Sequence, residues 1–176
     1  LYAVPNNSEM IASFKGDTSG PWDLMRTLSS PGNEMSFWSR WLLGWLKDSQ
    51  VNCITDASSA STTSLSPIGI NDGQSKGIVI PLSRYTALLI ESRRSVGYDS
   101  RLLADETGLL VYKLDTRISP GAGPIKIIAK NNAYTDRPFS IALHDMTRYL
   151  KAPLQINDSV TVDGYTIINV GDAATD

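Results

Sequence analysis

The spacing of apolar residues first predicts a helix. Between Phe37 and Lys47 the chain reads Phe-Trp-Ser-Arg-Trp-Leu-Leu-Gly-Trp-Leu-Lys, and its large apolar side chains recur at intervals of three and four residues. This period predicts an amphipathic helix with one apolar face. The residues on that face are Trp38, Trp41, Leu42 and Trp45. Ser36 is a suitable N-cap, and Asn33 is the alternative if the helix begins one turn earlier.

Three further residues of this segment carry expectations. Gly44 lies inside the predicted helix, where glycine costs about 1 kcal/mol relative to alanine. We therefore expect another backbone to pass close to it. Arg40 and Lys47 are expected to face solvent. All four tryptophans of the protein lie between Gly20 and Leu46, which suggests that this stretch docks against another part of the structure.

Further along the chain the pattern changes to strands. Six segments are rich in β-branched and aromatic residues and are bounded by turn residues. They are Gly77–Leu82, Tyr85–Arg93, Gly108–Asp115, Pro124–Ala129, Asp158–Val162 and Tyr165–Val170. Asp163-Gly164 between the last two is a strong hairpin signal. Six strands at this spacing predict a small antiparallel sandwich or barrel.

These patterns divide the chain into three parts. Residues 1–49 form a short helical N-terminal part, residues 50–66 a Ser/Thr-rich linker, and residues 67–176 a β-rich domain. A short strand at Val51–Ile54 is compatible with the linker. The predicted fold class is therefore mainly β with a small helical portion.

Composition narrows the classes of partner and site. A formal net charge of -2 over 176 residues gives no reason to expect a nucleic-acid or anionic-membrane partner. No run approaches the roughly 18 apolar residues that a membrane span needs. Cys53 is the one cysteine and His144 the one histidine, so the chain can build neither an internal disulfide nor a zinc site of several imidazoles.

The charged residues of the β-rich part suggest structural roles. Glu91 and Arg93 are two apart in a predicted strand, so they share one face, and we expect a structural ion pair. Asp99, Asp105 and Glu106 lie between strands and are expected to be solvated turn carboxylates. The residues by themselves make no complete active site.

A series of short motifs resembles one family of enzymes. In order, they are Trp22-Asp-Leu-Met25, Ser36-Phe-Trp-Ser-Arg-Trp-Leu-Leu-Gly-Trp-Leu46, Ile78-Val-Ile-Pro81, Leu89-Ile-Glu-Ser-Arg93, Gly97-Tyr-Asp99 and Gly108-Leu-Leu-Val-Tyr112. Their order and spacing resemble those of immune inhibitor A-type zinc metallopeptidases, over about residues 1–115. Leu1-Tyr2 resembles the end of the zinc motif of that family.

The resemblance implies a function and a set of roles. It implies the C-terminal part of a secreted, metzincin-like peptidase, with the HExxHxxGxxD-type zinc motif just upstream of this chain. Met25 would be the Met-turn methionine beneath the zinc ligands, with Trp22 and Asp23 fixing the turn. No catalytic or metal-binding residue is then expected in this chain. Its partners would be the N-terminal catalytic half and protein or peptide substrates.

Three alternatives remain open from the sequence. Met25 could be an ordinary core methionine. The β-rich part could be a non-catalytic adhesion or carbohydrate-binding module, for which exposed tryptophans would be the sign. The chain could also derive from a peptidase that has lost its metal site.

Overall fold

The strands of this protein form one mixed sheet and a separate hairpin. A computed structural model describes residues 22–23, 34–56, 58, 60–119, 123–129 and 150–171. Its elements are helix α2 (Phe37–Leu42) and strands β1 (Val51–Cys53), β2 (Gly77–Pro81), β3 (Thr86–Arg93), β4 (Gly108–Asp115), β5 (Ile125–Ile128), β6 (Ser159–Val162) and β7 (Tyr165–Ile168), with single-turn 3-10 helices at Asp48–Gln50, Gly97–Asp99 and Ala104–Glu106. Met25 and His144 lie outside the described residues.

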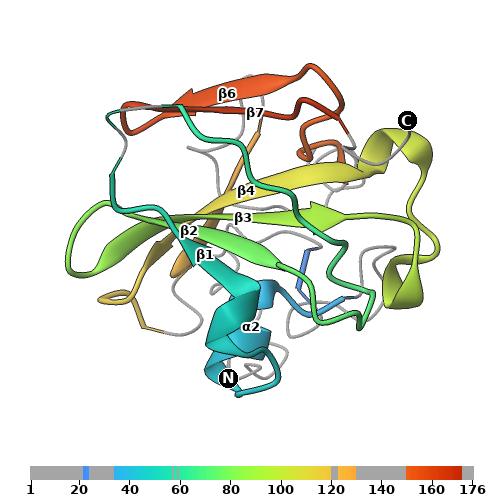
Figure 1. Cartoon of the computed structure of the whole chain (residues 1–176), viewed down its shortest axis with the longest axis horizontal. Coiled ribbons are helices and arrows are strands. Elements are labelled where there is room, and N and C mark those ends of the chain that lie inside the picture. The colour runs from blue at the N-terminus through green and yellow to red at the C-terminus, as the bar shows by residue number, and fades with distance from the viewer. Residues whose placement is uncertain are drawn as a thin grey trace, which may run out of the picture.

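The larger sheet has five strands in the order β1-β2-β3-β4-β5 (Figure 1). Each of the pairs β2–β3, β3–β4 and β4–β5 is antiparallel, whereas β1 runs parallel to β2. The mainly β prediction is confirmed. The expectation of a wholly antiparallel arrangement is wrong at this first pair, because the long connection from residue 54 to residue 76 returns the chain in the same direction.

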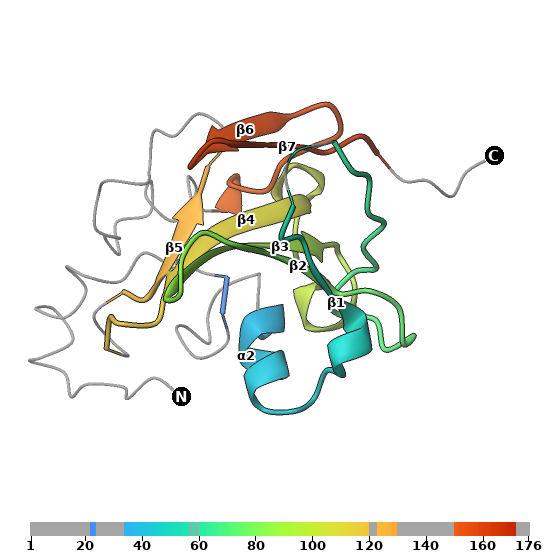
Figure 2. The same cartoon turned by 60° about the vertical axis from the view of Figure 1, so that its left-hand side comes forward.

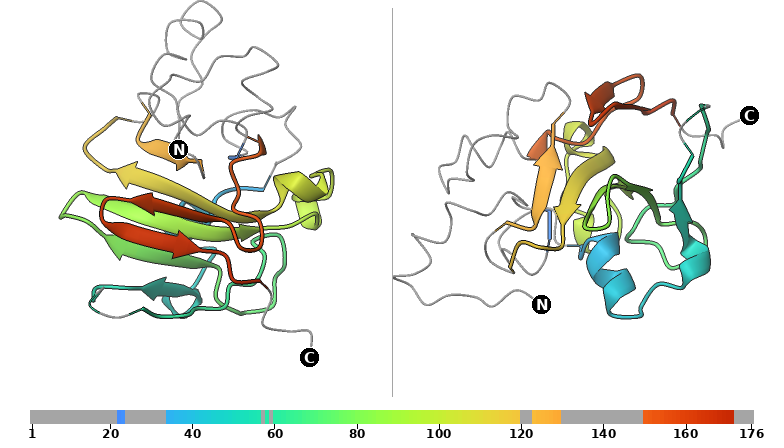
Figure 3. Two further views of the ribbon diagram at one scale, coloured as in Figure 1. Left: turned by 90° about the horizontal axis from the view of Figure 1, so that it is seen from above. Right: turned by 90° about the vertical axis from the view of Figure 1, so that its left-hand side faces the viewer.

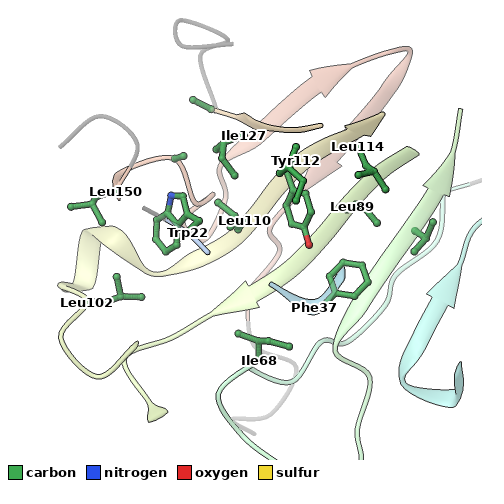
Figure 4. Close-up of a cluster of buried hydrophobic side chains, with 14 residues drawn as sticks. Trp22, Phe37, Ile68, Leu89, Leu102, Leu110, Tyr112, Leu114, Ile127 and Leu150 are labelled. Atoms are coloured by element: carbon green, nitrogen blue, oxygen red, sulfur yellow. The ribbon is translucent and has the colours of Figure 1, made fainter. Parts of the chain in front are cut away.

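The five-stranded sheet is covered on both faces (Figure 2). Hairpin β6–β7 packs on one face, where Val160, Val162 and Ile167 join a core with Leu88 and Ile90. The opposite face carries α2 (Figure 2, Figure 3) and the buried Trp22 (Figure 4). Side chains alternate between the two faces of a strand. Successive residues of β3 therefore serve two cores.

The β6–β7 turn follows its sequence. Asp163 and Gly164 have φ values of 49° and 83°, the left-handed pair that a two-residue type I′ hairpin requires. This hairpin prediction is confirmed.

The core on the α2 side joins distant parts of the chain. Trp22 and Phe37 pack there with Leu89, Leu110 and Tyr112 (Figure 4). The rings of Phe37 and Tyr112 are 6.2 Å apart. Described residues from both 1–49 and 67–176 therefore share one core, and β1, inside the predicted linker, is an edge strand of the sheet. The boundaries predicted at 50–66 do not separate two cores.

The helix differs from its prediction. It ends at Leu42, and Gly44 has φ 71° with no atom within 4 Å of a would-be Cβ. Gly44 is thus a left-handed residue after the helix, and the expectation of a close backbone neighbour is wrong. Trp38 and Trp41 pack at the margin of the core, but Leu42 and Trp45 are 66% and 65% exposed. The residue that α2 buries completely is Phe37.

None of the helices in the described part of the chain is long and apolar enough to cross a membrane.

The contact between Phe37 and Gly77 provides a test of the fold. A Cβ added at Gly77 would lie 2.5 Å from Cδ2 of Phe37. We expect Gly77→Ala to lower the free energy of unfolding by about 1–3 kcal/mol, since the ring has to move out of a packed core. Urea denaturation followed by circular dichroism measures the change.

A double variant supplies the control. Phe37→Leu removes the ring and should make Gly77→Ala less costly in its presence than alone. Equal costs in the two backgrounds would show that Phe37 does not pack against β2.

Candidate functional site

Glu91 and Arg93 of β3 form a buried ion pair. The pair lies on the face of the sheet that α2 covers. Nη1 of Arg93 lies 2.8 Å from Oε1 of Glu91, and both side chains are completely buried. The expected ion pair is therefore present, and it lies deep in the structure. Burying two charges is costly unless other hydrogen bonds complete their surroundings. The neighbouring groups supply those bonds.

Asp99 provides a second carboxylate for the same guanidinium. It comes from the 3-10 turn Gly97–Asp99, and its Oδ2 lies 2.8 Å from Nε of Arg93, while its Oδ1 accepts from Nη2 at 3.1 Å. One hydrogen bond and one close charge contact thus join the guanidinium to Asp99. The expectation that Asp99 is a solvated turn residue is wrong, because this pairing holds it in the interior.

Arg93 also binds the N-terminal segments. Nη1 donates to the backbone carbonyl of Trp22 at 3.3 Å, and Nη2 donates to that of Glu34 at 3.2 Å. The guanidinium carbon lies 5.2 Å from the centre of the Trp22 ring, within the range of a cation–π contact. One side chain of the sheet therefore fixes two stretches of backbone that lie about 60 to 70 residues earlier in the sequence.

The second oxygen of Glu91 reaches the start of α2. Oε2 accepts from the backbone N–H of Phe37 at 2.7 Å and from the hydroxyl of Tyr112 at 3.1 Å. Burial raises the pKa of Glu91, and the adjacent Arg93 and these two donors oppose that rise. Burial and the neighbouring carboxylate raise the pKa of Tyr112 well above its ordinary value. Its hydroxyl therefore stays protonated and donates to Glu91.

The pKa of Arg93 is also set by burial and by neighbouring charges acting in opposite directions. Burial by itself would lower the pKa of Arg93, but the carboxylates of Glu91 and Asp99 outweigh it and raise that pKa. The guanidinium is therefore a permanent charge.

Asp23 caps the helix together with two serines. Its Oδ2 accepts from Oγ of Ser36 at 2.9 Å and from Oγ of Ser39 at 3.1 Å. The Oγ of Ser36 in turn accepts from the backbone N–H of Ser39, so the predicted N-cap is confirmed. Asp23 is buried, and its negative charge lies beside the N-terminus of α2, where it is favourable.

Glu34 and Arg40 form a second pair on the same side. Arg40 is half-buried, donates from Nη2 to Glu34, and donates to the backbone carbonyls of Met35 and Ile68, both at 3.1 Å. Burial lowers the pKa of Arg40. The other oxygen of Glu34 accepts from the backbone N–H of Tyr98 at 2.9 Å. The expectation that Arg40 faces solvent is wrong, because it clamps two loops together.

The remaining predicted carboxylates differ from each other. Asp105 is exposed and pairs with Lys151 at 2.9 Å, as a surface turn residue would. Glu106 is buried, and its Oε2 accepts from the N–H of Leu103. The prediction of a solvated residue is thus wrong for Glu106.

A small hollow of about 200 Å³ lies beside Asp23 and the start of α2. Its walls combine apolar side chains of the sheet with Trp22 and with polar groups of Asp23, Ser36 and Tyr112. Much of this volume is open to solvent, and the space that water can occupy inside it is about 10 Å³, room for at most one water molecule.

These charged residues hold backbone segments in place. We call the set Asp23, Glu34, Arg40, Glu91, Arg93 and Asp99 the anchor network. Within the described ranges, no three His, Cys, Asp or Glu side chains are placed to hold a metal ion. Cys53 is an exposed free thiol. The network has neither a nucleophile paired with a base nor an open carboxylate pair; it anchors residues 22–23 and 34–37 on the sheet.

Glu91 and Arg93 were predicted as an ion pair, and the resemblance gave Asp23 a role in fixing a turn, but the extent of the anchor network was not predicted. Glu34 had no expected role, and Asp99 and Arg40 were expected in solvent. A Gly-Tyr-Asp turn shortly after Arg93 was the available signal for Asp99.

Comparisons with known proteins found no matching family model, no matching curated protein and no matching solved structure.

The anchor network leads to a stability prediction. Glu91→Gln leaves Arg93 in the interior with one carboxylate fewer, so we expect a loss of about 3–5 kcal/mol in the free energy of unfolding. Guanidinium denaturation monitored by tryptophan fluorescence measures it, because Trp22 lies against Arg93.

A thermodynamic cycle separates this effect from general core damage. Arg93→Met combined with Glu91→Gln should cost clearly less than the sum of the two single variants, since Glu91 and Arg93 are both neutralised in the double variant. Asp99 loses Arg93 in the Arg93→Met variant and in the double variant alike, so this loss is counted once. Additive costs would contradict a coupled pair. The surface pair gives the control: Asp105→Asn should change stability by no more than about 1 kcal/mol.

Proposed function

We propose that this chain is part of a secreted zinc metallopeptidase and supports a catalytic site whose zinc ligands lie upstream of it. The support is the ordered set of motifs shared with immune inhibitor A-type enzymes. In such an enzyme two histidines and a third ligand hold zinc, and a glutamate takes a proton from the zinc-bound water that attacks the peptide bond. Substrates would be proteins or peptides.

One observation favours a supporting role for the residues in hand. Trp22 and Asp23, which come three and two positions before Met25, are buried and fixed from two directions. The sheet holds Trp22 through Arg93, and α2 holds Asp23 through Ser36 and Ser39. A segment that lies beneath metal ligands needs a fixed backbone of this kind, because groups behind the ligands orient them.

In this proposal the β-rich part acts as a scaffold for the catalytic half. Met25 contributes an apolar floor through its flexible thioether side chain. The anchor network keeps the preceding residues in place and transfers no proton in the reaction.

The exposed aromatic residue at the end of α2 favours a second candidate function. Trp45 is 65% exposed next to Leu42 and Leu43, and exposed aromatic surface is typical of binding sites. A non-catalytic adhesion or carbohydrate-binding module would use it. Trp45→Ala should then abolish retention on immobilised glycans, while the buried Trp22 serves no such contact.

The coding sequence upstream of Leu1 tests the peptidase proposal. We expect an HExxH helix within a few tens of residues, and the longer protein containing it should hydrolyse casein in a reaction that a chelator stops and zinc restores. An upstream sequence with no trace of HExxH contradicts the proposal. A degenerate HExxH points instead to a domain that has lost its metal.

Zinc titration tests which part of the proposed enzyme supplies the metal ligands. The 176-residue chain should bind zinc only weakly, and the longer protein should bind one ion tightly, because the ligands come from the upstream part. Calorimetry on both proteins measures this. Tight binding by the 176-residue chain would contradict the assignment of the ligands to the upstream part.

A further inference from the structure

Strand β7 has an outer edge whose backbone groups face away from its partner strand. In an antiparallel pair, alternate residues direct their N–H and C=O groups toward the partner. Asn169 exchanges bonds with the β6 side, donating to the carbonyl of Asp158 and accepting from the N–H of Asn157. By the alternation, Tyr165 and Ile167 also bond toward β6, and Thr166, Ile168 and Val170 direct their backbone groups outward.

This edge is open in the described part of the chain. Among the described residues, no backbone hydrogen bond joins Thr166, Ile168 or Val170 to a residue outside the β6–β7 hairpin. The side chains of Ile168 and Val170 are also 53% and 68% exposed. Hairpin β6–β7 forms the outer layer of the molecule, opposite α2 (Figure 1, Figure 2).

The edge lacks the features that usually prevent pairing between strands. Protected edges carry a lysine, a proline or a bulge. The stretch from Tyr165 to Val170 reads Tyr-Thr-Ile-Ile-Asn-Val and contains no lysine, no proline and no charge. A bulge lies on the β6 side of the hairpin, where Asn157 and Asp158 both bond to Asn169. A two-stranded sheet is marginal by itself, and three or more strands make it stable. An added strand would therefore complete this layer.

The sequence of the edge matches a second copy of itself. In an antiparallel arrangement centred on Ile168, Ile168 faces Ile168 of the second copy, and Thr166 faces its Val170. Each pair is uncharged and β-branched, which favours cross-strand packing. The formal net charge of -2 also gives little repulsion between two copies. A closed two-fold pairing uses the same patch on both chains.

We propose that β7 is a homodimerisation edge, where two copies join their hairpins into one four-stranded antiparallel sheet, β6-β7-β7-β6. The contact is small and built mainly on backbone hydrogen bonds, so the dimer is weak and forms as concentration rises. The proposal does not depend on the peptidase function.

Sedimentation velocity over the micromolar range tests the pairing. It is done in a reducing buffer, because the exposed Cys53 could otherwise cross-link two chains. The 176-residue chain should shift from monomer to dimer with rising concentration. Ile168→Lys places a charge opposite its own copy and should weaken the dimer at least tenfold.

A matched variant and a second measurement decide the result. Leu103→Lys changes another aliphatic residue of similar exposure (64%) outside β7 and should leave the dimer intact. A monomer at all concentrations, equal dimerisation of all three proteins, or open-ended growth into larger species would each overturn the proposal. Hydrogen exchange reads the edge directly: the Thr166 and Ile168 amides should exchange more slowly at high concentration, and an unchanged rate would also overturn it.

Discussion

The structure depends on the enclosure of the Arg93 guanidinium. The guanidinium pairs with the carboxylates of Glu91 and Asp99 and donates to the backbone carbonyls of Trp22 and Glu34. It also lies over the face of the Trp22 ring. A buried arginine is tolerable only when nearby carboxylates and hydrogen bonds compensate its charge in this way. Each partner is therefore constrained by the others: the turn after β3 supplies Asp99, the strand supplies Glu91, and the N-terminal segments supply the carbonyls.

The alternation of β3 explains how one strand supports both a polar and an apolar core. Leu88 and Ile90 point toward the hairpin and pack there with other apolar residues. Glu91 and Arg93 point to the other face, where Leu89 and Tyr112 surround them with apolar surface. The low polarity of that surface strengthens the charge pairs and also makes the loss of one partner costly. The apolar face contributes burial, while the polar face determines which backbone segments can dock on it.

The sequence predicted the strands well and the polar network only in part. Strand β4 has the predicted bounds, Gly108–Asp115, because a local run of β-branched and aromatic residues is enough to define it. The Glu91–Arg93 pair followed from strand period alone. Asp99 and Arg40 were misplaced because their burial depends on partners distant in sequence, and charged loop residues are usually exposed. Trp45 was misplaced because Gly44 adopts a left-handed conformation and ends the helix before the apolar face is complete.

The hydrogen bonds of the anchor network reach from the sheet to N-terminal residues. One bond of the network joins neighbouring strands, from Tyr112 of β4 to Glu91 of β3. The other bonds that Arg93, Glu91 and Asp99 make outside their own group reach Trp22, the backbone of Glu34 and the N–H of Phe37. Buried ion pairs are often no more stabilising than apolar packing of the same volume. What this network adds is a fixed position on the sheet for Trp22, Glu34 and Phe37. Trp22, which the network holds, is the first residue of the motif Trp-Asp-Leu-Met that resembles a metallopeptidase turn. The polar network is thus arranged to hold N-terminal residues in one position against the sheet.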